Sequence, residues 1–185
     1  MEYPVNDPRH PHPALDANYD ARAFQDFDDV WFVAAPGGTS DVTITVPDDK
    51  ALFFPLPNAE VSSLEAPPFY GATAVQQRSK AKFFADHIVN VSLTIDGTAV
   101  GPIGAFRALS PQFRFDAPTP WIYGAMGGRG TSVGDGYYVL LEPLSKGEHT
   151  VHVTGAFHFN AGEVPEFGPD PVDIPVDVIW HVKVR

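Results

Sequence analysis

Two runs of β-branched and aromatic residues within Asp135–Gly155 constrain the fold more than any other part of the chain. Tyr137–Glu142 and His149–Thr154 have the composition of β-strands, and a short link bounded by Pro143 and Gly147 separates them. Extended runs bounded by Pro and Gly are typical of β-hairpins. The sequence therefore predicts an antiparallel pair here, to which other strands of the chain would add.

Alternating apolar and polar residues predict further strands, most clearly at Asp41–Val46 and Ile174–Val184. Val30–Ala35 is apolar at almost every position and is expected to be a central strand. The proline-rich Leu56–Tyr70 and the glycine-rich Ala117–Gly134 are expected to be irregular loops. Shorter strands are expected at Lys50–Pro55, Val91–Ile95, Thr98–Val100, Phe106–Leu109 and Gln112–Phe115, with a tight turn at Asp96-Gly97.

Ala72–Val89 is the one segment whose spacing predicts a helix. Thr73 is its expected N-cap, and Val75, Phe83 and Phe84 are expected on its buried face. Because strands and helices do not alternate along the chain, a parallel α/β fold is excluded. The predicted fold class is all-β: an antiparallel β-sandwich, jelly-roll or immunoglobulin-like, with one short helix.

The 185 residues are enough for one domain with a hydrophobic core. Residues 1–29 are rich in proline and aspartate, so we expect an extended N-terminal arm, with a short helical turn near Ala21–Phe27. Residues 30–185 are expected to form a single β-sandwich domain.

The formal net charge of −11 disfavours nucleic acid and anionic membrane surfaces as partners. There is no cysteine, so disulfides, cysteine-ligated zinc and a thiol nucleophile are excluded. No apolar run approaches the roughly 18 residues of a membrane-spanning helix, and membrane insertion is not expected. The first residues lack the apolar stretch of a secretory signal, which is compatible with a cytoplasmic protein. The sequence makes no prediction of oligomeric state.

Two sequence blocks resemble those of a group of small, uncharacterised exported bacterial proteins. The first block is Val46-Pro47, then Lys50–Pro55, Asn58 and Glu60. The second block is Asp135–Tyr138, then Leu144, Gly147 and His149–His152. The resemblance covers about Val30–Gly155 and implies an extracellular or periplasmic β-sandwich without implying a reaction. Members of the group tend to carry a signal peptide and a pair of cysteines. The positions that match the two cysteines are near Ile44 and Val61 in this chain.

The first functional hypothesis is a non-catalytic module that binds carbohydrate or another small polar ligand. Loops on a rigid sandwich are common binding sites, and aromatic rings suit the apolar faces of sugars. Trp121 and Tyr123 are expected to stack on the ligand. Hydrogen bonds to it are expected from Asn58, Glu60, Arg107 and Arg129. Packing of Trp121 against the end of the sandwich is the alternative interpretation.

The second hypothesis is a small lyase, isomerase or hydrolase in which Glu60 or Asp135 acts with His152 as acid and base. This mechanism requires the side chains to converge in one pocket. The third hypothesis is a structural or interaction protein whose free strand edge pairs with a partner, most naturally through the C-terminal strand.

No motif for a bound metal or cofactor is present, because the histidine spacing does not suit a shared ion. Glu163, Glu166, Asp170 and Asp173 are a weak candidate for a Ca²⁺ site in an acidic loop at 163–173. Gly130–Gly134 matches the G-x-S-x-G pattern of a hydrolase nucleophile, but its strand-to-helix context is absent.

Overall fold

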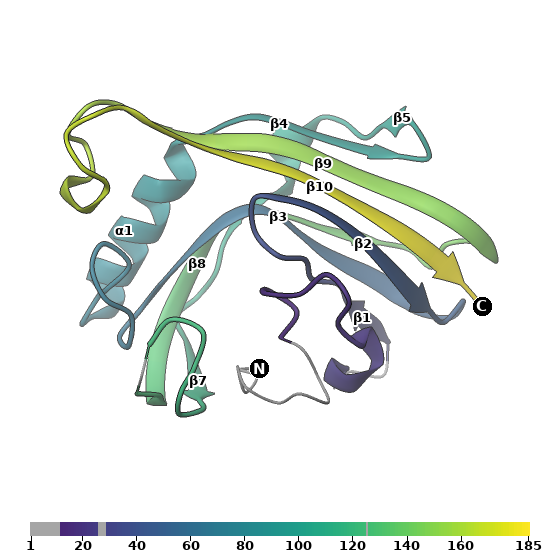
Figure 1. Ribbon diagram of the computed structural model, residues 1–185, viewed down its shortest axis with the longest axis horizontal. Helices are drawn as coiled ribbons and strands as arrows, with labels where there is room; N and C mark the ends of the chain where they lie inside the picture. The colour runs from purple at the N-terminus through teal and green to yellow at the C-terminus, as the bar shows by residue number, and fades with distance from the viewer. Residues whose placement is uncertain (1–11, 26–28, 125) are drawn as a thin grey trace.

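The computed structural model describes residues 12–25, 29–124 and 126–185, and within them the chain folds into two stacked β-sheets with one α-helix (Figure 1). The strands of the first sheet are β1 (Val30–Phe32), β3 (Ala51–Ser62), β6 (Arg107–Leu109), β7 (Phe113–Ala117) and β8 (Gly128–Leu141). The strands of the second sheet are β2 (Thr39–Val46), β4 (Ile88–Ile95), β5 (Thr98–Ala99), β9 (Gly147–Phe159) and β10 (Val172–Val184). The predicted all-β, sandwich-like fold class is confirmed.

Both sheets are mixed rather than purely antiparallel. The first sheet has the order β1-β3-β8-β6, with β7 also paired to β8, and the second has the order β2-β10-β9-β4-β5. β1 runs parallel to β3 and β2 runs parallel to β10, whereas the other pairs are antiparallel. β10 therefore lies between β2 and β9 over Asp177–Val184, and this stretch is not the free edge that the interaction hypothesis requires.

The predicted hairpin at Asp135–Gly155 is wrong, because its two strands belong to opposite sheets. β8 pairs with β3, β6 and β7, whereas β9 pairs with β10 and β4. Residues 142–146 therefore cross from one sheet to the other. Both strands still direct apolar residues into the shared core, including Val139 and Val151, which is why their local pattern resembles that of a hairpin.

Three other predictions are corrected by the extents and pairing of the strands. Val30–Ala35 was expected to be central, but β1 lies at the edge of its sheet. Leu56–Ser62 was expected to be irregular, but it continues β3. β1 pairs only with Ala51–Phe53 of β3. Beyond Phe53, β1 forms no hydrogen-bond ladder on this edge of β3, so Pro55 and Pro57, which lack a backbone N–H, interrupt none there. Similarly, Gly128–Gly134 belongs to β8 rather than to a loop.

The short-range predictions agree with the structure. The Asp96-Gly97 turn joins β4 to β5, and both residues have the positive φ angles that a tight hairpin turn requires. A 3₁₀-helix at Ala21–Phe24 occupies part of the expected helical turn. The adjacent Tyr19 is buried, and its hydroxyl donates to the Ala34 carbonyl oxygen at 2.9 Å. The arm prediction for residues 1–11 and 26–28 lies outside the described residues.

The helix α1 (Ala74–Asp86) begins at the predicted N-cap, where the Thr73 hydroxyl accepts a hydrogen bond from the Gln76 backbone N–H. Its buried face differs from the prediction: Val75 is 78% exposed, whereas Gln77 is fully buried. The Gln77 amide donates to the carbonyl oxygens of Gly71 and Thr131, and its oxygen accepts from Gln112. An amide whose hydrogen-bonding groups are all satisfied can replace an apolar side chain in a core. The hydrophobic periodicity of the sequence therefore predicted the wrong buried face for α1.

The core has two parts. The larger cluster lies between the sheets, where Phe54 and Trp180 meet edge to face at 5.1 Å. The smaller cluster joins α1 to β3, β8 and β9, and it includes Phe84 and Phe159. Figure 1 shows α1 between β8 and the β9–β10 pair, at the end of the sandwich far from the C-terminus. The helix therefore packs between the two sheets at this end.

Candidate functional site

The three candidate acid–base residues do not form one site. Glu60 lies on β3 and His152 on β9, in opposite sheets, and the His152 ring pairs with Asp177 at 2.7 Å. Ala59 is opposite Asp135 in the β3–β8 register, so Glu60 and Asp135 point to opposite faces of the sheet. The structure therefore does not bring together the carboxylate–histidine pair that the enzymatic hypothesis requires.

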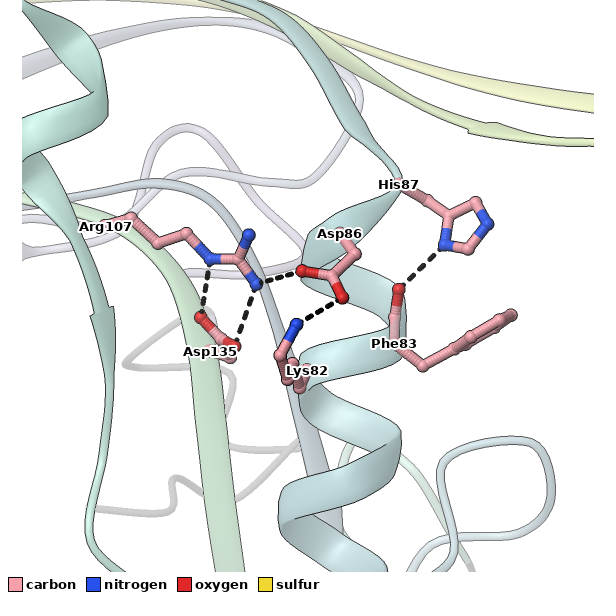
Figure 2. A network of polar contacts seen from close by, with 6 residues as sticks. All are labelled: Lys82, Phe83, Asp86, His87, Arg107 and Asp135. Atoms are coloured by element: carbon pink, nitrogen blue, oxygen red, sulfur yellow. Dashed lines mark hydrogen bonds and ion pairs between the residues drawn. The ribbon is translucent and has the colours of Figure 1, made fainter.

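Asp135 is buried, with 2% of its surface exposed, and it binds Arg107 through two hydrogen bonds (Figure 2). Arg107 Nε donates to Oδ1 at 3.1 Å, and Nη2 donates to Oδ2 at 3.0 Å. Arg107 Nη2 also donates to Asp86 at 2.7 Å, and Asp86 in turn accepts from Lys82. The Lys82 hydrogen bond, followed by that of Arg107, lowers the pKa of the Asp86 carboxyl.

This ion-pair network links the C-terminal end of α1 to β6 and β8. Arg107 was predicted to bind a ligand and Asp135 to act in catalysis. Each instead holds the other, and the guanidinium is already bonded to two carboxylates. The role of this network is to fix the helix on the first sheet.

The remaining aromatic-loop candidates are dispersed. Trp121 is only 4% exposed and packs against Phe115 and Tyr123, as the packing alternative expected. Arg129 is 93% exposed at its side chain and pairs with Asp116 at 3.4 Å. Tyr123 is 54% exposed and lines a pocket that neither Trp121 nor Arg129 reaches. Of this group, only Tyr123 and Asn58 border the same cavity.

That cavity, the phenylalanine pocket, has a volume of about 310 Å³ and lies between the sheets beside α1. This volume is at the lower end of the range for small-molecule sites, about 300–1,000 Å³. Five phenylalanines from the β3–α1 loop, α1, β9 and the β9–β10 loop line it: Phe69, Phe84, Phe157, Phe159 and Phe167. Their rings form a continuous set, with Phe69 and Phe84 at 4.7 Å and Phe159 and Phe167 at 5.4 Å.

A second cavity of about 270 Å³ adjoins the phenylalanine pocket. Asn58, Phe157 and Ile174 line both cavities. The side chain of Asn58 is held in place, because its amide donates to the Leu56 carbonyl oxygen at 2.7 Å. The two cavities therefore provide adjacent space for a ligand larger than a single ring.

The polar groups of the phenylalanine pocket come from Asn58, Glu60, Glu65 and Tyr123. Asn58, Ala59 and Glu60 are consecutive, so the pocket follows the edge of β3 rather than one face of it. Glu60 has no hydrogen bond or ion pair with another described residue.

Tyr138 lies outside the lining of the pocket. Burial, followed by the charges of Asp135 and Glu60, raises the pKa of Tyr138 to about 12, so this phenol remains neutral at physiological pH.

Sequence reasoning missed the phenylalanine pocket because its residues come from four separate segments. One local signal was present: Phe157 and Phe159 are two apart on a strand, so both rings point to the same face. Both rings belong to β9, which extends through Phe159, beyond the strand predicted at His149–Thr154.

Five described histidines pair with carboxylates rather than gathering around a common point: His87, His149, His152, His158 and His181. His149 bonds to Asp96, and His158 bonds to Asp173, one of the four candidate Ca²⁺ ligands. Another candidate, Glu163, accepts from the backbone N–H of Asn160. Within the described ranges, no group of three histidine, aspartate or glutamate side chains is placed to hold a metal ion.

The G-x-S-x-G match has no exposed nucleophile. Ser132 is fully buried inside β8, and its hydroxyl donates to the Val61 carbonyl oxygen at 3.0 Å. A nucleophilic serine requires an exposed hydroxyl on a sharp strand-to-helix turn. This serine instead fixes β8 to β3.

Comparison with known proteins gives no match: no family model, curated protein or solved structure is similar enough to place the chain in a family. Among the helices in the described parts of the chain, none has the length and apolar character needed to cross a membrane. The functional argument therefore rests on the pocket itself.

Proposed function

We propose that this protein is a non-catalytic binding protein for a small molecule, with the phenylalanine pocket as its site. The observation that carries this proposal is a pocket of about 310 Å³ lined by five phenylalanines, with a few polar groups from Asn58, Glu60, Glu65 and Tyr123. Ligand sites commonly combine apolar walls with a few polar groups that orient the ligand.

The lining favours a ligand with an apolar body over a free sugar. A sugar hydroxyl that is buried against an apolar wall loses its hydrogen bonds to water. Each hydrogen bond that the protein does not replace costs roughly 1–3 kcal/mol of binding free energy. An aromatic or branched aliphatic group gains about 25 cal/mol for each Å² removed from water. The carbohydrate hypothesis is therefore replaced by a ligand with an apolar body and at least one polar group.

Titration with prodan, a small neutral dye that fluoresces more strongly in apolar sites, tests this proposal. Ile174→Trp places a larger side chain at a lining position that is 38% exposed, so it can fill the site without removing a core residue. We expect saturable binding of prodan to the wild-type protein and at least tenfold weaker binding to Ile174→Trp.

Leu140→Trp is the matched control, because Leu140 is an exposed apolar strand residue that lines neither the phenylalanine pocket nor the cavity next to it. It should bind prodan as the wild-type protein does. Equal loss of binding in both variants, or no saturable binding to the wild-type protein, would refute the proposed site. A panel of mono- and disaccharides in a thermal-shift assay then tests the carbohydrate alternative.

A further inference from the structure

The described ionisable side chains that line the phenylalanine pocket are acidic, and none is basic. Its lining includes two carboxylates, Glu60 and Glu65, and the Tyr123 phenol. No lysine, arginine or histidine from the described residues lines it. The nearby network does not compensate, since Arg107 is bonded to Asp86 and Asp135. The pocket thus combines apolar walls with a carboxylate, Glu60, whose charge no described cation balances.

A carboxylate beside apolar rings is poorly solvated, and an opposite charge close to it restores the lost interaction energy. Glu60 is half-buried, and it has no hydrogen bond or ion pair with another described residue. The surrounding rings contribute in the same direction, because the faces of aromatic rings attract cations within about 6 Å. Both features favour a positively charged group and disfavour an anion.

We propose that the ligand is a cationic amphiphile, which is an amine or quaternary ammonium with an aromatic or aliphatic body. This inference rests on the proposed function. The body would occupy the phenylalanine pocket, and the ammonium would lie beside Glu60. The net charge of −11 agrees with this chemistry, because a negative field accelerates the approach of cations and slows that of anions. Phe157 and Ile174 also border the adjoining cavity, which provides space for a longer body.

Three compounds with the same phenyl group separate charge from apolar binding: phenethylamine, phenethyl alcohol and hydrocinnamate, which are a cation, a neutral molecule and an anion at neutral pH. Their affinities are measured by displacement of prodan, with calorimetry as a check. We expect phenethylamine to bind about tenfold more tightly than the alcohol, and hydrocinnamate to bind most weakly. Added salt should weaken the binding of the amine more than that of the alcohol.

Glu60→Gln tests the residue that carries the preference, and the measured quantity is the ratio of the amine and alcohol affinities. We expect this ratio to fall from about ten to near one in Glu60→Gln. Glu142→Gln is the control, since it removes the same charge from an exposed residue that lines neither cavity. It should retain the wild-type ratio.

The possible outcomes distinguish the two proposals. If prodan and the alcohol bind but the amine shows no advantage, the cationic preference is refuted and the binding function stands. The same conclusion follows if Glu60→Gln and Glu142→Gln have equal ratios. If no member of the series displaces prodan from the wild-type protein, or prodan itself does not bind, both proposals fail.

Discussion

At the scale of single residues, Asp135 shows how a sequence signal for function can have a structural cause. It lies at the junction of a glycine-rich segment and a strand, which made it a catalytic candidate. In the folded chain it is a buried carboxylate whose charge is balanced by Arg107. Removing one partner of a buried ion pair strongly destabilises the folded protein, because the other charge is left buried and uncompensated.

Arg107→Met should therefore destabilise the protein by about 3 kcal/mol, near the lower end for buried pairs, because the guanidinium is partly exposed. The measurement is the free energy of unfolding in urea. The double variant Asp135→Asn/Arg107→Met should recover part of the loss, since it also removes the buried charge. If the double variant is less stable than Arg107→Met, the uncompensated charge is not the cause.

Gly136 follows Asp135 and illustrates a second structural cause. It lies inside β8, opposite an irregularity in β3 between Pro55 and Asn58. Its φ angle is +152°, and an added Cβ atom would lie 2.3 Å from the Asn58 Cα atom. The glycine is therefore required by a close contact between two strands and not by a turn.

At the scale of elements, α1 determines where the pocket lies. Its N-cap, Thr73, could be predicted because capping depends on residues close in sequence. Its buried face could not, because Gln77 is satisfied by Gly71, Thr131 and Gln112, the last two of which are distant in sequence. The same limit explains β3, whose prolines are tolerated only because of where its neighbours begin and end.

Thr73→Ala should lower the free energy of unfolding by about 1 kcal/mol, because it removes the hydrogen bond from the Thr73 hydroxyl to the Gln76 N–H. Chemical denaturation followed by circular dichroism measures the loss. Thr98→Ala serves as the control, since Thr98 is exposed at the start of the short β5 strand and caps no helix. Similar losses in both variants would contradict a specific role for the cap.

At the scale of the whole molecule, His149 connects parts of the chain that are distant in sequence. It lies near the start of β9, and its ring pairs with Asp96 in the β4–β5 turn at 2.7 Å. The Asp96 hydrogen bond, followed by that of Ser145, raises the pKa of His149 above its ordinary value of 6.5. The same contact with His149 lowers the pKa of Asp96 below 3.8.

These shifts predict how the pair contributes to stability as pH changes. The His149 contribution is complete below pH 6.5 and is lost as the pH rises through the raised pKa. The Asp96 contribution is complete above pH 3.8 and is lost as the pH falls through the lowered pKa. The pair therefore stabilises the fold most between these two values.

His149→Gln should reduce the free energy of unfolding most at about pH 5, within this interval, and least above pH 8. Thermal unfolding at a series of pH values provides the measurement, with the wild-type protein compared at each pH. Asp96→Asn should show the same dependence, because either change removes the ion pair. A loss that is equal at every pH would contradict the assigned pair.

The sequence by itself determined the features that depend on neighbouring residues: the alternating strands β2 and β10, the Asp96-Gly97 turn, the start of α1 and the all-β class. Local φ and ψ preferences and the two-residue period of strands are sufficient for these. Only the tertiary structure decided which sheet each strand joined, that Asp135 is bound by Arg107, and that five phenylalanines surround one pocket. These depend on contacts between distant segments, such as the Trp180 indole donating to the Ala34 carbonyl oxygen, which no local pattern encodes.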